Sequence, residues 1–463
     1  MNRVLITFLA IPCLARGICA QVATRAQNAT RVIVGTDTVR RLSIDSDTAF
    51  HPIELQRAIE LAQANAPSAV QAHGQIRVAN AEVRQAYAAF LPNASITAGQ
   101  TQQMGSRIGP QGTIVPFTPP HSWSYSTGLR GSLRLFDGGQ RFFQISQSKA
   151  DVSSAEANEV AQQFNLALQV KTQYYAILGA RESEVAALAQ LDQAQADMQA
   201  ASARVRAGAA TLSDSLRTVI EVGNARLALL TAQNNLRVAS AALTRLVAAP
   251  YLVTAASSDT LEQALSPVDS AALVQYAQRG PAVEVAAAQF TAAKAAVRTA
   301  KSVYLPTLDL SFSRGGSGYA PYGTGVADDR LYPYVNTYSF SLSYPLFNNY
   351  QREFSLTQAQ VSQANADAAL RDARFLAQQN LTQQLASLRA AQERIQIQEA
   401  SVASAEEDLR VQQQRYTLGA STLLDLLTSQ TTLNQQRAAL IQARQDYRIA
   451  RAQIEAIIGR DLQ

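Results

Sequence analysis

The internal duplication of this sequence constrains its fold more than any other feature. Five residues of the first half recur in the same order in the second half, and 415 − 204 = 211 gives their spacing. The two sets are Arg204, Gly208, Thr211, Leu212 and Asp214, and Arg415, Gly419, Thr422, Leu423 and Asp425. A chain repeated in this way is expected to fold as two similar units.

Each half carries one stretch in which apolar and polar residues alternate strongly. Residues 122–135 and 331–346 place aromatic residues on one face and mainly Ser, Thr or Arg on the other, which predicts strands. Weaker strands are expected at 93–103 and 307–314. One such strand alone would favour a half-buried position in a soluble β-sandwich. A membrane barrel explains the aromatic face as lipid-facing; its candidates are Trp123, Tyr125, Tyr338 and Phe340, with Ser124, Arg130 and Ser341 toward the lumen.

Two very long helices are predicted, one after each strong strand. No proline interrupts residues 140–206 or 351–416, and a helix of that length spans about 100 Å. Gly208 and Gly419 end these helices, and a second helix follows each of them, over about 212–247 and 422–458. The segments 105–121 and 315–330 contain Gly, Pro or Tyr between strands and are interpreted as loops.

Composition excludes several classes of protein. The chain has 463 residues and a mean hydropathy of −0.08, and no uninterrupted apolar run of about 18 residues predicts a transmembrane helix. The formal charge of +5 is too weak an excess at this length to indicate a nucleic acid or anionic partner.

The ends of the predicted elements suggest a domain order. Residues 1–20 resemble a secretory signal, with Arg3 before an apolar run and cleavage after Ala20, or alternatively after Ala15. A flexible leader (21–50), a first repeat (51–248), a linker (249–264) and a second repeat (265–463) are expected to follow.

Four strands in one chain cannot close a barrel. Open sheet edges would leave unpaired backbone groups in lipid at a cost of several kcal/mol each. The smallest filled barrels need about eight strands. Two copies would supply eight strands and three copies twelve, so the pattern predicts an obligate oligomer whose helices continue the tube.

The whole arrangement resembles the TolC-like outer-membrane efflux protein family over essentially the mature chain. The residues that carry the resemblance are Leu55, Ala58 and Pro67, the two helix stops Phe90-Leu91-Pro92 and Tyr304-Leu305-Pro306, the run Leu135 to Arg141, Arg415 to Gly419, and Asp425 to Leu427. The resemblance implies a mainly α fold with a membrane β-part: a trimeric 12-stranded β-barrel continued by a long α-helical periplasmic barrel. It also implies an outer-membrane location, a periplasmic adaptor protein and an inner-membrane pump as partners, and passive conduction of substrates from that pump.

The two helix ends are the candidate docking tips. Glycine there is required for a C-terminal cap with positive φ. The resemblance further implies that these turns dock the adaptor; their residues are Arg206, Ala207, Gly208, Thr417, Leu418 and Gly419.

Asp214, Asp425 and Tyr416 are candidates for the channel entrance. A carboxylate in the first turn of a helix is favoured by the positive helix end, which is one interpretation of both aspartates. The resemblance implies the other, an acidic ring at the tunnel mouth. In a trimer, the like charges of such a ring would raise each other's pKa, so the ring would be only partly ionised in mild acid. Tyr416 matches an aromatic residue of the closed entrance or belongs to the core. Ser421 and Thr428 replace an Arg and a second Asp of the family pattern, which argues against an ion-pair latch.

No enzyme site or cofactor site is expected. His51, His73 and His121 lack the spacing of metal ligands, and no nucleophile or carboxylate pair stands out. A secreted coiled-coil filament or stalk is the alternative function, but it does not explain the duplicated strands. The sequence does not indicate the transported substrate.

Overall fold

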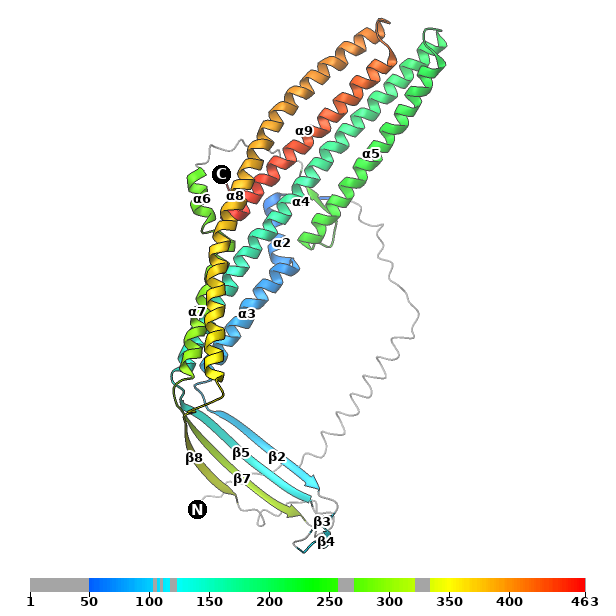
Figure 1. Ribbon diagram of the computed structural model, residues 1–463. Coiled ribbons are helices and arrows are strands. Elements are labelled where there is room, and N and C mark those ends of the chain that lie inside the picture. The colour runs from blue at the N-terminus through cyan, green and yellow to red at the C-terminus, as the bar shows by residue number, and fades with distance from the viewer. Residues whose placement is uncertain are drawn as a thin grey trace. The chain divides into compact units, whose positions relative to one another are not determined.

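Two pairs of long helices dominate the computed structural model (Figure 1). α4 (Gln140–Arg206) and α8 (Gln351–Thr417) have 67 residues each, and α5 (Leu212–Val247) and α9 (Leu423–Ile458) have 36 each. None of the four contains a proline, which explains their length. α4 packs along α5, α8 packs along α9, and α4 also lies against α9. No helix in the described part of the chain is long and apolar enough to cross a membrane.

The structure describes residues 50–102, 106–108, 111–116, 123–256, 270–320 and 334–462. The described residues from His51 onward form one compact unit. The expected signal peptide at 1–20 lies outside the described residues, as does the expected leader except for its last residue, Phe50.

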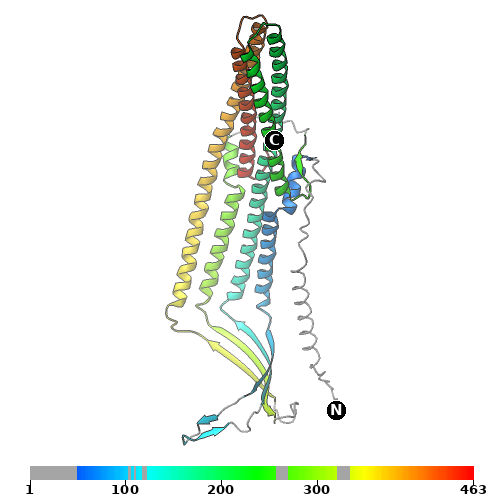
Figure 2. The same ribbon diagram turned by 90° about the vertical axis from the view of Figure 1, so that its right-hand side faces the viewer.

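In the described residues, four shorter helices accompany the long ones. They are α2 (Leu55–Asn65), α3 (Pro67–Ala88), α6 (Ser270–Ala277) and α7 (Pro281–Ser302). Pro67 and Pro281 begin α3 and α7, a position where the missing N–H costs no hydrogen bond. α3 packs on α4, and α7 packs on both α4 and α8, so equivalent helices of the two halves alternate (Figure 2).

A four-stranded antiparallel sheet joins the two halves. Its order is β2–β5–β7–β8, with β2 (Asn93–Gln102) and β5 (Trp123–Phe136) from the first half and β7 (Thr307–Ala320) and β8 (Val335–Ser343) from the second. Leu133 pairs with Leu310 and Phe312 with Tyr338. The strands β2 and β8 form the two edges of the sheet.

Three segments differ from the sequence interpretation. The expected loop after residue 314 begins as strand, because β7 continues to Ala320 and pairs there with Trp123 of β5. The expected loop at 105–121 contains a small hairpin of β3 (Ser106–Ile108) and β4 (Ile114–Pro116). The expected linker at 249–264 contains the buried strand β6 (Val253–Ala255), which pairs in parallel with β1 (His51–Ile53). Gly-rich or very short strands lack an alternation of apolar and polar residues, so they can be recognised as strands only from their backbone pairing in the structure.

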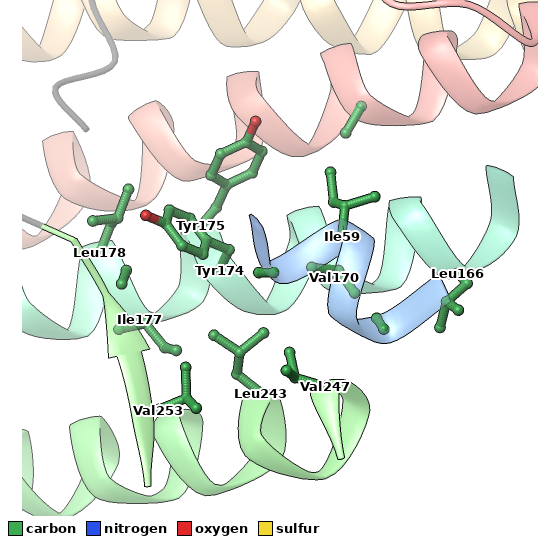
Figure 3. Packing of buried hydrophobic residues seen from close by; sticks show 14 of the residues in the cluster. Ile59, Leu166, Val170, Tyr174, Tyr175, Ile177, Leu178, Leu243, Val247 and Val253 are labelled. Carbon is green, nitrogen blue, oxygen red and sulfur yellow. The ribbon is translucent and has the colours of Figure 1, made fainter. Parts of the chain in front are cut away.

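The main core lies where α2, α4, α5 and β6 meet (Figure 3). Tyr174 is fully buried there, and its hydroxyl donates to the carbonyl of Ile53 at 3.0 Å while it accepts from the N–H of Ala256 at 3.1 Å. This one side chain therefore connects α4 to the chain after β6 and to β1.

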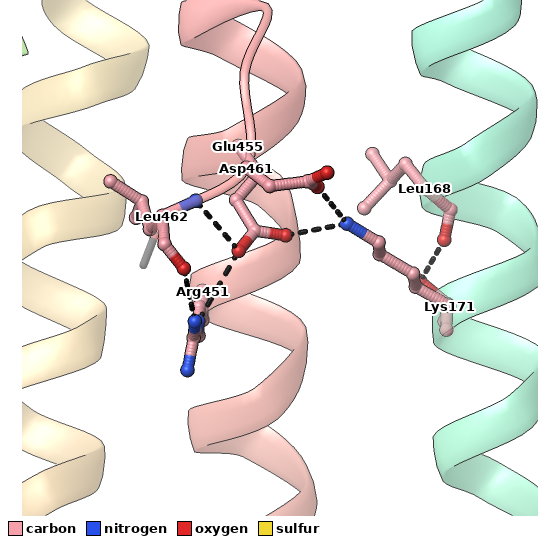
Figure 4. A network of polar contacts seen from close by, with 7 residues as sticks. Leu168, Lys171, Arg451, Glu455, Asp461 and Leu462 are labelled. Atoms are coloured by element: carbon pink, nitrogen blue, oxygen red, sulfur yellow. Dashed lines mark hydrogen bonds and ion pairs between the residues drawn. The ribbon is translucent and has the colours of Figure 1, made fainter. Parts of the chain in front are cut away.

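A polar cluster ties α4 to the end of α9 (Figure 4). Lys171 Nζ lies 2.7 Å from both Glu455 Oε2 and Asp461 Oδ1, and Arg451 donates to Glu455 and to the carbonyl of Leu462. Burial lowers the pKa of Lys171, but the hydrogen bonds to Asp461 and Glu455 outweigh it, so the net pKa is raised. Lys171 therefore stays charged and holds the two halves together.

The two junctions between sheet and helices occupy equivalent positions in the two halves. At the first, Asp137 is 4% exposed and accepts from Arg141 Nε at 2.7 Å, and Arg141 also donates to the carbonyls of Ala89 and Leu135. At the second, Arg352 donates to the carbonyls of Pro345 and Leu346. The side chains of Asp137 and Arg141 thus clamp the first junction more tightly.

Candidate functional site

The free ends of α4 and α8 have the same local structure. Gly208 and Gly419 have φ values of +72° and +74°. The N–H of Ala209 donates to the carbonyl of Arg204 at 2.9 Å, and the N–H of Ala420 to that of Arg415 at 2.8 Å. These are Schellman caps. All six expected tip residues lie in the two turns and are exposed; they are Arg206, Ala207, Gly208, Thr417, Leu418 and Gly419.

The helices that leave the tips begin with identical capping boxes. The N–H of Asp214 donates to Thr211 Oγ1 at 3.2 Å, and Asp214 Oδ2 accepts from the Thr211 N–H at 3.2 Å. Asp425 and Thr422 repeat this arrangement. A carboxylate at this position satisfies backbone donors at the helix start.

The capping contacts decide the charge of both aspartates within the chain. The side-chain hydrogen bond from Thr211 is the largest cause of the lowered pKa of Asp214. The backbone hydrogen bond from Thr422 does the same for the pKa of Asp425. Within one chain these bonds favour the charged form, and the partial ionisation expected for aspartates repeated around an oligomer stays a prediction.

A contact between the two tips was not foreseen from the sequence. Arg204, near the end of α4, donates to the carbonyls of Tyr416 and Thr417, each at 3.0 Å. Its guanidinium carbon also lies 4.5 Å from the centre of the Tyr416 ring. Tyr416 is half-buried under this cation and is held by it. The only sequence signal was the recurrence of Arg204 as Arg415, which reaches only Ala420 of its own turn, at 3.5 Å.

The expected entrance residues are not brought into one cluster within the chain. Tyr416 contacts Arg204, whereas Asp214 and Asp425 are each bonded to their own capping threonine. Among the described residues neither aspartate has an ion pair. Thr428 donates to the carbonyl of Leu424 inside α9. The residues around the tips therefore provide no ion-pair latch in the described chain.

Farther along the helices from the tips, polar contacts connect neighbouring helices. Asp197 of α4 accepts from Gln430 of α9 at 2.6 Å, and Asp408 of α8 accepts from Ser429 of α9 at 2.6 Å. Three ion pairs follow between α8 and α9: Glu406–Arg437, Glu399–Arg444 and Arg394–Asp446, at 2.7, 3.1 and 3.0 Å. We refer to these three pairs as the α8–α9 ladder. They depend on helix register, which the sequence alone did not define.

The sheet has one mainly apolar face and one mainly polar face. Phe312 pairs with Tyr338 and Leu310 with Phe340 on one face, where Tyr338 and Phe340 are each 70% exposed. Arg134 and Asp309 pair on the other face, with 2.9 Å between Nε and Oδ1. Trp123 and Tyr125 belong to β5, but their side chains lie outside the described part.

The described residues contain no group of three or more His, Cys, Asp or Glu side chains that could hold a metal ion. The rings of His51 and Tyr251 pack at an angle of 60° with 4.8 Å between their centres, and His73 Nδ1 lies 3.4 Å from Glu159 Oε1. His121 lies outside the described residues.

Comparison with known proteins identifies the family. The model of the outer membrane efflux protein family matches residues 58–249 and 272–460. The chain belongs to this family. Protein CyaE of Bordetella pertussis is 28% identical over 393 residues, which cover 82% of this chain and 78% of CyaE. The pyoverdine export outer membrane protein OpmQ of Pseudomonas aeruginosa is 25% identical over 398 residues, 86% of this chain and 83% of OpmQ.

A solved structure agrees with the fold. The outer membrane protein VceC from Vibrio cholerae superimposes with a TM-score of 0.69 at 20% identity, over 88% of this chain and 97% of VceC. The protein is thus an outer-membrane channel of the tripartite efflux and secretion type, with a periplasmic helical domain, and not an enzyme. The expected TolC-like fold, location and function are confirmed, and the alternative of a secreted filament is wrong.

Proposed function

We propose that three copies of this chain form a twelve-stranded barrel and a continuous helical duct that conducts substrates passively out of the cell. The observation that carries the proposal is that β2 and β8 lie at the two ends of the sheet, and the outer edge of each has no partner strand among the described residues. In lipid, each edge must pair with another strand, and another copy supplies a β2 edge for every β8 edge. Three copies with four strands each leave a water-filled lumen, whereas eight strands would be filled by side chains.

In this arrangement the apolar face of the sheet meets lipid and the polar face lines the lumen. Trp123, Tyr125, Tyr338 and Phe340 are the proposed lipid-facing aromatic residues. The pairing of Phe340 with Leu310 and of Ser341 with Asp309 supports the assignment, because direct partners share a face. Two structural repeats at 51–248 and 265–463, joined by a linker at 249–264, would each supply two strands and one long helical hairpin.

The tips are proposed to dock a periplasmic adaptor protein, which couples the duct to an inner-membrane pump. Their six residues are exposed, and a Cβ added at Gly208 or Gly419 would meet nothing within 4 Å. The turns are thus ordered by their caps but leave a free surface. Asp214, Asp425 and Tyr416 would then surround the mouth of the duct.

The trimer is tested by native mass spectrometry of protein extracted from outer membranes. We expect a mass of three chains, and monomers or dimers would contradict the proposal. Phe340→Cys and Ser341→Cys separate the two faces of the barrel. A membrane-impermeant thiol reagent should label Cys at 341 and not at 340, and equal labelling would contradict the barrel assignment.

The entrance is tested in planar bilayers. Acidic residues around a constriction concentrate cations, so Asp425→Asn should reduce cation selectivity measured as the reversal potential in a salt gradient. Asp367→Asn is the matched control. Asp367 lies on α8 about 75 Å from the tip of that helix, so its substitution should leave the reversal potential unchanged. An unchanged reversal potential for Asp425→Asn would show that this residue only caps α9.

A further inference from the structure

One charged residue lies on the apolar face of the sheet. Among the described strands β2, β5, β7 and β8, the charged residues are Arg130, Arg134, Asp309 and Arg314. Arg134 pairs with Asp309 and Arg130 with Ser313, on the polar face. Arg314 instead pairs with Leu129 on one side and Asn336 on the other, in line with Phe312 and Tyr338 two residues along.

The position of Arg314 along the strand places it at a border of the apolar band. Between Leu308 and Arg314, β7 rises about 20 Å, or about 15 Å along the membrane normal at a tilt of about 40°. Exposed aromatic residues at the helix end of the sheet, including Phe347 and Tyr350, extend the band in the other direction. Beyond Arg314, the β7 positions of the same parity are Gly316, Gly318 and Ala320, and their partners on β5 are Thr127, Tyr125 and Trp123. Tyr and Trp are enriched at the interface of a membrane with water, so the pair Tyr125 and Trp123 marks the border farther from the periplasmic helices. Arg314 therefore lies just inside that border, on the side of the outer leaflet, from which its long side chain can extend to the headgroups.

The guanidinium of Arg314 is available to a ligand. The side chain is exposed, and within the described residues it makes no hydrogen bond and no ion pair. The guanidinium lies over the ring of Tyr334, whose centre is 5.2 Å from the guanidinium carbon. An arginine in lipid is costly at the bilayer midplane but not at an interface, where an anion can pair with it.

We propose that Arg314, supported by Tyr334, binds the phosphate group of an outer-leaflet lipid. A guanidinium matches a phosphate because two parallel N–H groups donate to two oxygens. The tyrosine ring holds the cation beside the sheet through a cation–π contact and leaves its N–H edge free. Asn336, the direct partner of Arg314 on β8, lies in the same row and on the same face of the sheet. The inference rests on the proposed barrel only in that this face of the sheet must meet lipid.

The test is titration of the purified full-length oligomer with bisphosphorylated lipid A, followed by native mass spectrometry. Loss of a charge-assisted bidentate contact predicts about tenfold weaker binding for Arg314→Gln. Arg314→Lys keeps the charge but loses the two parallel N–H donors of the guanidinium, and should weaken binding about threefold. Fully dephosphorylated lipid A, which keeps the acyl chains, should bind the unmodified protein as weakly as the bisphosphorylated lipid binds Arg314→Gln.

Arg130→Gln is the matched control, because it removes the same charge from the adjoining residue row on the opposite face. It should bind lipid A like the unmodified protein. Equal affinities of the unmodified protein and Arg314→Gln, or equal binding of the two lipids, would overturn the inference. If the barrel itself is wrong, the mass spectra show no trimer and the unmodified protein also fails to retain lipid, which separates the two failures.

Discussion

The two junctions between sheet and helices derive from equivalent parts of a duplicated sequence, but different interactions stabilise them. Asp137 at the first junction accepts from the N–H of Gly139 at 3.1 Å and from the Arg141 guanidinium. Asn348 stands at the equivalent position of the second junction, since 348 − 137 = 211. There Asn348 Oδ1 and Arg352 Nε are both buried and, among the described residues, have no hydrogen-bond partner.

The backbone follows the same path through both junctions with different residues. Gly138 and Gly139 have φ values of +66° and +83°, whereas Asn349 and Tyr350 adopt +54° and +60°. A left-handed conformation costs a non-glycine residue about 1–2 kcal/mol. The ring of Tyr350 packs edge-on against Phe347 at 5.6 Å. The second junction thus has the same backbone geometry as the first, but it contains two non-glycine residues with positive φ and two buried polar atoms without a hydrogen-bond partner among the described residues. We therefore expect it to attach its helices to the sheet less firmly.

The largest expected effect comes from a Cβ at the first junction. At Gly138 it would lie 2.5 Å from Leu305 Cβ and 2.7 Å from the carbonyl oxygen of Ser302, in addition to the positive φ. Gly138→Ala should therefore lower the free energy of unfolding by about 2–5 kcal/mol. Thermal unfolding of the detergent-solubilised protein, followed by circular dichroism, measures this.

Asn349→Ala provides the comparison, because this position already carries a Cβ. We expect the free energy of unfolding to fall by less than about 1 kcal/mol, because Asn tolerates positive φ better than Ala does. Equal destabilisation by the two substitutions would show that the junctions are not packed differently.

The ionic clamp should give the next largest effect. Asp137→Asn keeps the shape but removes the charge next to Arg141, and should cost about 1.5–3 kcal/mol. The reverse change, Asn348→Asp, gives Arg352 Nε an anionic acceptor and should stabilise by up to about 1 kcal/mol. The midpoints of thermal unfolding should move in opposite directions. Two shifts of the same sign would contradict the proposed difference between the junctions.

The α8–α9 ladder should give a smaller effect that depends on salt. Its side chains are 37–52% exposed, so each pair contributes about 0–1 kcal/mol and is screened by ions. Among the described residues no ion pair connects α4 with α5. Hydrogen exchange should therefore accelerate between low and high salt in α8 and α9 but not in α5. The variant Arg437→Gln should reduce this salt dependence, and uniform acceleration in all helices would argue against the ladder.

The smallest effect is expected at the tips, where the two halves are alike. Both aspartates have a pKa below the ordinary value of 3.8. Their contribution to stability is therefore complete above that value and is lost as the pH falls through the lower folded pKa. Thr211→Ala and Thr422→Ala should each increase amide exchange in the first turn of the following helix, to a similar extent and mainly above pH 4. Unequal changes would reveal a difference between the tips.

The sequence predicted elements well where local signals are continuous. The absence of proline and the two glycines placed α4 at 140–206 and α5 at 212–247, as the structure has them. The face of Tyr338 and Phe340 followed from alternation. Interactions that depend on tertiary register were missed: Arg204 reaches Tyr416 across the tips, and Gly316 belongs to β7 only because it pairs with Thr127.

The strand order also has a consequence for how the chain folds. Leu133 pairs with Leu310, so 310 − 133 = 177 residues separate the central partners, whereas 338 − 312 = 26 separate Phe312 and Tyr338. Closing the longer loop costs about 1.7 kcal/mol more entropy, which favours local hairpins early and the central pair late. The helices reduce this cost, because α5, with 36 residues, returns the chain part of the way along the 67 residues of α4, and α7, which also packs on α4, carries it on toward the sheet before the second half adds its strands.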